Sequence, residues 1–304
     1  MTHPFVVAPE VAAALPEGRA VVALESTLLT HGLPAAAAAE FGRAVEAEVR
    51  GCGAVPATIA VLGGTIHVGL SAAELDELLG SGAAVKAGIR DLPVVCATGR
   101  NAGTTVASTS LIAHRVGIPV FATGGLGGVH RDFAESHDES GDLGALGDLA
   151  LSVVCSGVKS ILDVGATLER LETLNVTVVG FATDRFPGFY VADSGFAAPA
   201  RLDTVADLAA AVRMRDSLGL SAAIVVANPA PEPMVADVHD ELLAQATAAA
   251  REHKVTGAAF TPFVLREFAR RSAGASVRVN CELVRSNARL AAQLAVELAQ
   301  SAAP

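Results

Sequence analysis

Short apolar runs rich in β-branched residues recur along the chain, and many of them end in glycine, serine or threonine. Runs of this kind are typical of parallel strands that are covered on both faces. Segments with helical spacing lie between them. This alternation predicts an α/β fold, namely a three-layer α/β/α sandwich around a mixed, largely parallel central sheet. The predicted strands are residues 21–27, 94–99, 120–125, 153–157, 178–183 and 224–229.

A smaller pattern predicts an addition to this sheet. Residues 57–68 alternate apolar and other side chains around Gly63-Gly64, which indicates a small β-hairpin extension. Residues 131–147 are polar, acidic and aperiodic, and we expect a long loop there. No repeat or linker divides the chain, so residues 1–304 are expected to form a single catalytic α/β domain. The predicted helices are a short one opening at residues 71–74 and others at 103–116, 160–173, 236–252, 261–271 and about 281–300.

Charge and composition exclude several classes of protein. The net charge of -10 argues against a nucleic-acid binder, which would carry a basic surface. No apolar run approaches the roughly 20 residues of a membrane span, and the N-terminus lacks the basic region of a signal peptide. The four cysteines lack CxxC spacing and are expected to be reduced thiols. We therefore expect a cytoplasmic protein that acts on a small molecule.

Lysine is rare in this chain. Of 22 basic residues only Lys86, Lys159 and Lys254 are lysines, and lysine, unlike arginine, can lose its proton and attack a carbonyl. Lys159 lies between a predicted strand and the predicted helix 160–173. The positive end of that helix and the apolar surroundings would both lower its pKa. Position alone leaves Lys159 equally a nucleophile or a residue that binds an anion.

Two further features suggest a site for an anionic substrate. Glu25 lies inside an apolar strand, where burial would raise its pKa and suit a general acid, although a structural ion pair is an equal alternative. Lys86 and the turn at Gly103-Thr104-Thr105-Val106, which opens a helix, could hold a phosphate. An ordinary helix cap would have the same sequence.

The glycine-rich turn at residues 123–128 lacks the spacing of a dinucleotide-binding fingerprint. It would let His130 and the acidic loop fold close to the strand ends. Carboxylates without paired His or Cys suit a hard cation such as Mg²⁺ or Mn²⁺, but a solvated acidic loop is the simpler interpretation.

Several of these stretches, taken in order, resemble one enzyme family. They are residues 23–27, 31–34, 56–60, Lys86 with 90–92, 103–106, 121–131, 153–163, 227–229, 261–263 and 280–287. In this order they resemble the pseudouridine-5'-phosphate glycosidase family, some members of which are called indigoidine synthase A-like. The resemblance spans roughly residues 20–298.

The resemblance implies reversible cleavage of pseudouridine 5'-phosphate with water, which gives uracil and ribose 5-phosphate. The bond is a C–C glycosidic bond, and carbon is a poor leaving group. An imine between Lys159 and the ring-opened ribose would supply the electron sink that such a bond needs. By resemblance Glu25 is the proton donor that opens the ring.

The resemblance also assigns the remaining site residues and a homotrimeric assembly. Lys86 with Thr104, Thr105 and Val106 would bind the phosphate. Asp138 would bind a hard divalent metal ion, expected to be Mn²⁺. Ser140, Gly141 and Asp142 would contact the substrate, and His130 and Asn280 would recognise uracil. The family tends to have Asp-Ile-Ser-Ala-Asp where this chain has residues 138–142 as Asp-Glu-Ser-Gly-Asp, which puts metal affinity in question more than chemistry.

Two other functions fit the same residues. A Schiff-base aldolase acting on a sugar phosphate would form an adduct on Lys159 without any dependence on uracil. A non-catalytic sugar-phosphate-binding protein would tolerate Lys159→Arg, because charge alone would suffice.

Overall fold

The computed structural model describes residues 5–33, 35–80, 82–255 and 260–301. Within them, eleven strands form one mixed sheet in the order β1-β4-β3-β2-β7-β8-β11-β9-β10, with β6 paired to β3 and β5 paired to β6. The strands are β1 Phe5–Val7, β2 Val21–Leu24, β3 Val55–Leu62, β4 Thr65–Val68, β5 Val85–Ala87, β6 Ala102–Thr104, β7 Val120–Ala122, β8 Ser152–Cys155, β9 Thr177–Phe181, β10 Arg201–Leu202 and β11 Ile224–Ala227.

The sheet is largely parallel, as predicted. The strand pairs from β3 through β2, β7, β8, β11 and β9 to β10 are all parallel, whereas β3 pairs antiparallel with β4 and with β6. The β3–β4 pair is the predicted hairpin, and it turns at Gly63 and Gly64, both of which have positive φ. Every residue of β2, β7, β8 and β11 is buried, because helices cover both faces of these strands.

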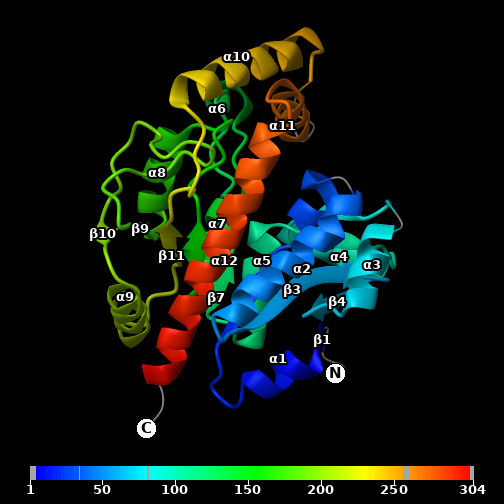
Figure 1. The fold of residues 1–304 in the computed structure, drawn as a ribbon, viewed down its shortest axis with the longest axis vertical. Helices are drawn as coiled ribbons and strands as arrows, with labels where there is room; N and C mark the ends of the chain where they lie inside the picture. Colours follow the sequence, from blue (N-terminus) through cyan, green and yellow to red (C-terminus); the bar gives the residue numbers. More distant parts are fainter. Residues whose placement is uncertain (1–4, 34, 81, 256–259, 302–304) are drawn as a thin grey trace.

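Helices form the two outer layers (Figure 1). Helix α12 crosses one face over β2, β7 and β8 and packs against α2 and α9, while α5, α7 and α8 lie on the other face. The helical segments are α1 Pro9–Ala14, the π-helix η1 Leu28–Gly32, α2 Ala35–Gly51, α3 Ala72–Gly80, the 3-10 helix η2 Ile89–Asp91, α4 Leu92–Ala97, α5 Val106–Val116, α6 Phe133–Ser136, α7 Gly141–Asp148, α8 Val164–Thr173, α9 Val205–Ser217, α10 Ala236–Glu252, α11 Phe260–Arg271 and α12 Ala275–Ser301.

The predicted strand at residues 94–99 is wrong, since this segment belongs to helix α4. Pro93 lies in the first turn, where its missing N–H costs nothing. Leu92 and Val95 are buried at helical spacing, whereas Val94 is 63% exposed. A strand covered on both faces would have buried Val94, whereas this run is buried on one helical side only.

Three predicted boundaries also differ from the structure. Residues 131–147 are not one loop, because they contain α6 and most of α7. The helix expected at residue 103 begins at Val106, since β6 first pairs with β3 and β5. The helix expected at about residue 281 begins at Ala275. The short helix expected at residue 71 is confirmed, and Ser71 and Glu74 form its reciprocal cap.

No helix in the described part of the chain is long and apolar enough to cross a membrane. All four cysteines are free.

Candidate active site

The carboxyl ends of adjacent parallel strands bring the two predicted catalytic residues to one edge of the sheet. Glu25 directly follows β2, and Lys159 follows β8, with β7 between the two strands. Ligands in such sheets collect beyond the carboxyl ends of the strands. The topology therefore places Glu25 and Lys159 where chemistry is expected.

Glu25 is held by a neighbour on β7's carboxyl end. The Thr123 hydroxyl donates a hydrogen bond to Glu25 Oε1. Burial raises the pKa of Glu25 and outweighs Lys159, the Thr123 hydrogen bond and Lys86, each of which lowers it, while Asp142 raises it further. The predicted direction of the shift is confirmed. These mutual effects also mean that Glu25, Lys159, Lys86 and Asp142 lie within electrostatic reach of one another.

The turn that carries Lys159 is fixed by its backbone. The Lys159 amide donates to Leu126 O at 3.1 Å, and the Leu162 amide donates to Lys159 O at 2.9 Å. Arg131 donates to Ser160 O, the next carbonyl, at 3.0 Å. The prediction that a helix begins directly after Lys159 is wrong, because α8 begins at Val164. Asp163 caps that helix. Its amide donates to Val129 O and so closes the turn.

The correction changes the argument for Lys159. Helix-dipole effects fade within the first turn, so α8 gives no direct reason for an activated amine. The side chains that act on this part of the site are Glu25 and Lys86, both charged neighbours in the cluster. Lys159 itself is partly accessible, as a residue that attacks a substrate must be.

Lys86 lies on β5, opposite Gly103 of β6 in the parallel register. The residue is exposed, yet protein atoms surround its ammonium group closely enough to desolvate it in part. This desolvation and repulsion from Lys159 lower the pKa of Lys86. His31 of η1 is close by, since burial and Lys86 both lower its pKa. Lys86 gives the acidic chain a local positive charge, and His31, whose lowered pKa favours the neutral imidazole, lies beside it.

The predicted phosphate turn is only partly open. Thr104 is fully buried, its hydroxyl donates to Ile59 O at 2.7 Å and its amide donates to Ser26 Oγ at 3.0 Å. Thr105 caps α5 and its amide donates to Ala87 O and Ser108 Oγ. The Val106 amide is the one in this turn for which the described residues supply no acceptor. Substrate contact by Thr104, Thr105 and Val106 stays a prediction, and the geometry favours Val106.

Asp142 joins this turn to the glycine-rich turn. Its carboxylate accepts from the Ala107 and Gly127 amides, both at 2.9 Å, and only 6% of the residue is exposed. Ser140 caps α7. A Cβ on Gly127 would lie 2.2 Å from Ser140 Oγ, so only glycine permits this approach. Asp142 thus orders the phosphate turn, and direct substrate contact by Ser140, Gly141 or Asp142 stays a prediction.

The predicted metal residue faces the predicted uracil residue. Asp138 Oδ2 lies 3.7 Å from His130 Nε2, and the His130 amide donates to Asp138 O at 3.1 Å. Among the described residues, no group of three His, Cys, Asp or Glu side chains could hold a metal ion. Mg²⁺-like cations accept one carboxylate with several waters. Asp138 fits a cation of that kind, and Mn²⁺ at this position stays a prediction.

The two departures from the family pattern have structural explanations. Glu139 forms a two-pronged ion pair with Arg170 of α8, with both N–O distances 3.1 Å, so its extra charge is neutralised. A Cβ on Gly141 would meet nothing within 4 Å, so alanine would also fit there.

Asn280 lies in the first part of α12, above the turn that follows β7. A Cβ on Gly124 would lie 3.2 Å from Asn280 Oδ1, which puts this side chain beside the residue after Thr123. Asn280 is therefore close to the Glu25 end of the site. Its role in binding uracil stays a prediction.

Thr123 and His31 belong to the site but received no role from the sequence. Thr123 follows a predicted strand in the glycine-rich turn, and His31 lies in one of the quoted motifs. These positions indicated that both residues could lie near the site. Thr123 contacts Glu25 and His31 lies near Lys86. These pairs are distant in sequence, so the sequence did not predict that they lie together.

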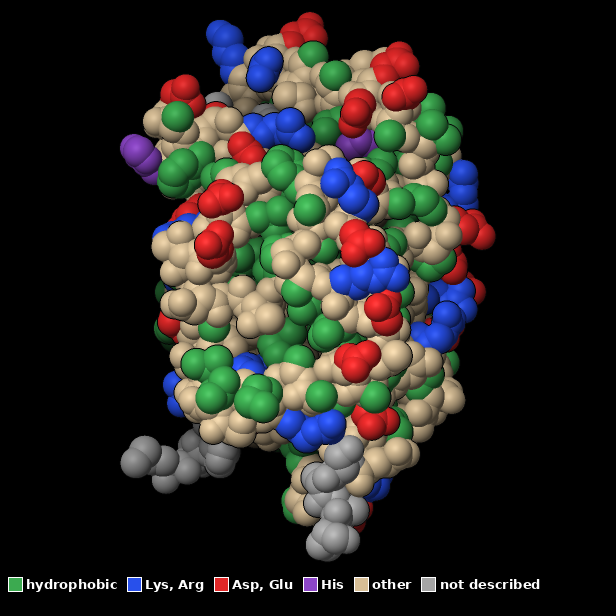
Figure 2. Space-filling model, turned by 90° about the vertical axis from the view of Figure 1, so that its left-hand side faces the viewer, with side chains coloured by type: hydrophobic (Ala, Val, Ile, Leu, Met, Phe, Trp, Pro, Cys, Tyr) green, Lys and Arg blue, Asp and Glu red, His purple; other side chains and the backbone are tan. Residues whose placement is uncertain are grey.

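A cavity of about 1000 Å³ lies at the opposite, amino ends of β9 and β11. Glu169, Glu172 and Arg215 are its charged lining residues. It lies on the side of the molecule that carries α9 and β10. Figure 2 shows this side, where acidic and basic side chains are interspersed around a hollow with hydrophobic side chains. Because this cavity contains neither lysine nor Glu25, the cluster at the carboxyl edge is the candidate active site.

Comparisons with known proteins identify the family of the chain. Residues 10–297 match the family model described as indigoidine synthase A like protein. A pseudouridine-5'-phosphate glycosidase of Salinispora tropica is 51% identical over 290 residues, covering 94% of this chain and 90% of that protein. One from Frankia alni is 49% identical over 294 residues, covering 96% and 81%.

Solved structures show the same fold. The prealnumycin C-glycosynthase AlnA, solved in complex with ribulose 5-phosphate, superposes with a TM-score of 0.90 at 34% identity and covers 98% of this chain and 97% of its own. An indigoidine synthase A-like protein of Thermotoga maritima gives a TM-score of 0.89 at 36% identity, with 98% of both chains covered. The chain belongs to the indigoidine synthase A-like family, which it shares with these pseudouridine-5'-phosphate glycosidases.

Proposed function

We propose that the chain is a pseudouridine-5'-phosphate glycosidase, a lyase-type enzyme that reversibly converts pseudouridine 5'-phosphate and water into uracil and ribose 5-phosphate. The observation that carries the proposal is the cluster of Glu25, Lys159 and Lys86 at the carboxyl edge of the sheet. Relatives of that name, nearly half identical over almost the whole chain, support it. So does the C-glycosynthase neighbour, whose name denotes formation of a C–C glycosidic bond.

The raised pKa of Glu25 suits the first step. A protonated Glu25 gives its proton to the ribose ring oxygen as the bond from that oxygen to C1' breaks. The Lys159 amine then forms a bond to C1' of the opened sugar. The phosphate, held by Lys86 and the Val106 amide, keeps C1' within reach of both groups.

The second step breaks the C–C bond. The Glu25 carboxylate left by the first step takes a proton from the Lys159 nitrogen, whose lone pair then forms a C=N bond to C1'. The electron pair of the C–C bond leaves with the pyrimidine, and C5 of uracil takes that proton back from Glu25. Water then hydrolyses the iminium to ribose 5-phosphate and free Lys159. In the reverse direction the iminium is the electron sink that accepts the pair from uracil.

Three finer features belong to the same proposal. A hard divalent cation, expected to be Mn²⁺, would be held by Asp138 and water and would add positive charge beside His130 and the substrate. The protein acts as a homotrimer and in the cytoplasm. The family resemblance supports these features, and Asp138 supplies a donor that suits the cation.

Trapping with borohydride tests the covalent step. The protein is incubated with ribose 5-phosphate and sodium borohydride, and the adduct is mapped by mass spectrometry. We expect one reduced pentose phosphate on Lys159. Lys159→Arg keeps the charge but should give no adduct and lower kcat for pseudouridine 5'-phosphate roughly 10³-fold or more. An active enzyme with no adduct on Lys159 would exclude the imine.

The same experiment separates the other functions. Uracil should discharge the unreduced adduct to pseudouridine 5'-phosphate, whereas an aldolase would ignore uracil. A sugar-phosphate-binding protein would form no adduct and would bind ribose 5-phosphate equally well as Lys159→Arg.

A further inference from the structure

Asn287 of α12 is a fully buried amide that contacts the carboxyl ends of three strands. Its Nδ2 donates to Thr123 O, after β7, at 2.8 Å. Ser156 Oγ, after β8, lies 3.1 Å from Nδ2. Asn228 Nδ2, after β11, donates to Asn287 Oδ1 at 2.9 Å. Asn287 is 0% exposed, and its main hydrogen-bond partners follow three different strands.

These partners fix the orientation of the amide. A backbone carbonyl such as Thr123 O can only accept, so it requires the NH₂ group of Asn287 on that side. Asn228 presents its own NH₂ group, which requires the oxygen on the other side. A flipped amide would face donor to donor and acceptor to acceptor. The network therefore permits one arrangement of Asn287.

Two of the contacts lead to the catalytic residues. Thr123 is held by Asn287 through its carbonyl, and its hydroxyl donates to Glu25. Ser156 begins the turn that ends at Lys159, and its amide donates to Gly124 O at 2.9 Å. Asn287 is thus linked to Glu25 through Thr123, and on its other side it contacts Ser156, which lies in the same short turn as Lys159.

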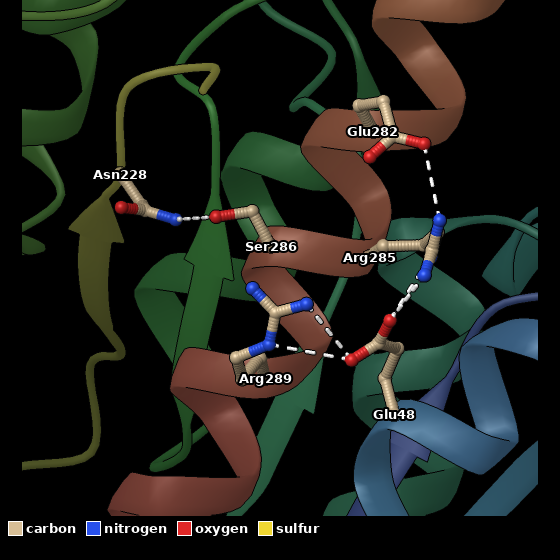
Figure 3. Close-up of polar contacts among 6 residues, drawn as sticks. All are labelled: Glu48, Asn228, Glu282, Arg285, Ser286 and Arg289. Atoms are coloured by element: carbon tan, nitrogen blue, oxygen red, sulfur yellow. Dashed lines mark hydrogen bonds and ion pairs between the residues drawn. The ribbon is translucent and has the colours of Figure 1, made fainter. Parts of the chain in front are cut away.

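The helix that carries Asn287 is itself fixed on both sides, as Figure 3 shows. Arg285 and Arg289 reach Glu48 of α2, with Nη2–Oε distances of 2.5 and 2.9 Å. Asn228 Nδ2 donates to Ser286 Oγ at 3.2 Å on the opposite side. Only a helix that cannot slide or rotate can hold a buried side chain at a set position.

We propose that Asn287 is a positioning residue that sets the distance between Glu25 and Lys159, an inference that rests on the proposed function. Proton transfer to the ring oxygen and attack at C1' must be aligned on one sugar. Misplacement of catalytic groups by about 1 Å can lower a rate by ~100-fold. Without Asn287, the ends of β7 and β8 lose the side chain that links them.

The test is steady-state kinetics of Asn287→Ala with pseudouridine 5'-phosphate, with the borohydride trapping rate measured in parallel. We expect kcat and the trapping rate to fall about 10- to 100-fold. KM should stay within about 3-fold, because Lys86 and Val106 hold the phosphate on other elements. The final yield of trapped Lys159 per total chain should be unchanged, whereas a partly unfolded sample would give a lower yield.

Two further variants keep the test decisive. Ser156→Ala removes only the contact beside Lys159 and should lower kcat and the trapping rate about 3- to 10-fold. Ser286→Ala removes a hydroxyl from the preceding position of the same helix, which touches neither Thr123 nor Ser156. Asn228 still bonds to Asn287 and Glu48 still pairs with Arg285 and Arg289, so this variant should behave as wild type. If Asn287→Ala does not fold, the comparison of Ser156→Ala with Ser286→Ala tests the positioning role of Asn287 in its place.

The outcomes separate this inference from the function. Wild-type kcat in folded Asn287→Ala, or equal kinetics for Ser156→Ala and Ser286→Ala, would overturn the role of Asn287 while the enzyme remains a glycosidase. A wild-type protein that forms the Lys159 adduct but does not cleave pseudouridine 5'-phosphate would overturn the proposed substrate.

Discussion

At the scale of single residues, Glu25 shows how a site is made at the expense of stability. Burial raises its pKa although Lys159, Thr123 and Lys86 all oppose the shift. A carboxyl group in such a place keeps its proton to higher pH and can donate it to a substrate. The same burial makes the ionised form unfavourable in the folded protein.

Glu25→Gln is therefore expected to stabilise the protein in a pH-dependent way. The folded pKa of Glu25 lies above its ordinary value of 4.5, so protonation favours folding. Below pH 4.5 wild type and variant should have similar Tm. As the pH rises through the raised pKa, wild type should lose stability relative to the variant. Calorimetric scans from pH 4 to 8 measure this difference, with exposed Glu17→Gln as the control, and a difference independent of pH would contradict it.

Asp138 is the residue on which the proposed metal depends. After chelation, activity should be lost and should return with added Mn²⁺. Asp138→Asn should need at least ~10-fold more Mn²⁺ for half-maximal activity, because it loses the charged ligand. The neighbouring Glu139→Gln is the matched control, since Glu139 is engaged with Arg170. Full activity of the chelated wild type would argue against a metal.

At the scale of elements, the turn between β8 and α8 determines where Lys159 lies. Gly157 has a φ of +84°, and a Cβ on it would lie 2.0 Å from Pro187 O, a backbone atom that cannot move alone. The Phe189 amide donates to Ser156 O at 2.9 Å, so the segment around Pro187 packs directly on this turn. The Lys159 turn is thus set by contacts from a distant loop as well as by its own sequence.

Gly157→Ala is expected to damage both stability and activity. The positive φ and the close carbonyl together should lower the free energy of unfolding by about 2 kcal/mol or more. Urea denaturation measures this loss. Gly141→Ala is the control, because its Cβ would meet nothing within 4 Å and should change stability by less than about 0.5 kcal/mol. Equal stability of the two variants would contradict this account.

At the scale of the whole molecule, one sheet edge gathers groups that are far apart in the chain. Strands β2, β7, β8 and β11 are adjacent and parallel, so the residues that follow them meet at one edge. Helix α12, the last element, crosses three of these strands and adds Asn280 and Asn287. The candidate site therefore needs the whole chain, from β2 to α12.

The homotrimer is expected at the same scale. Met214, Leu218 and Leu220, at and after the end of α9, are each more than half exposed, and such apolar surface favours association. Light scattering after size exclusion should give three times the chain mass of 30.7 kDa, independent of concentration in the micromolar range. A mass of one chain would contradict the trimer.

The sequence by itself determined the layered α/β fold and the hairpin, because buried strands have a distinct composition. It also singled out Glu25 and Lys159, because charged residues next to such strands are rare, although their catalytic roles came from the family resemblance. Only the tertiary structure decided where α8 begins, that residues 94–97 are helical, and that Thr123 and Asn287 join Glu25 to Lys159. These depend on contacts between distant segments, such as Asn287 with Thr123 and Gly157 with Pro187. The hydrophobic pattern indicates which residues are buried, but it does not indicate which buried groups contact one another.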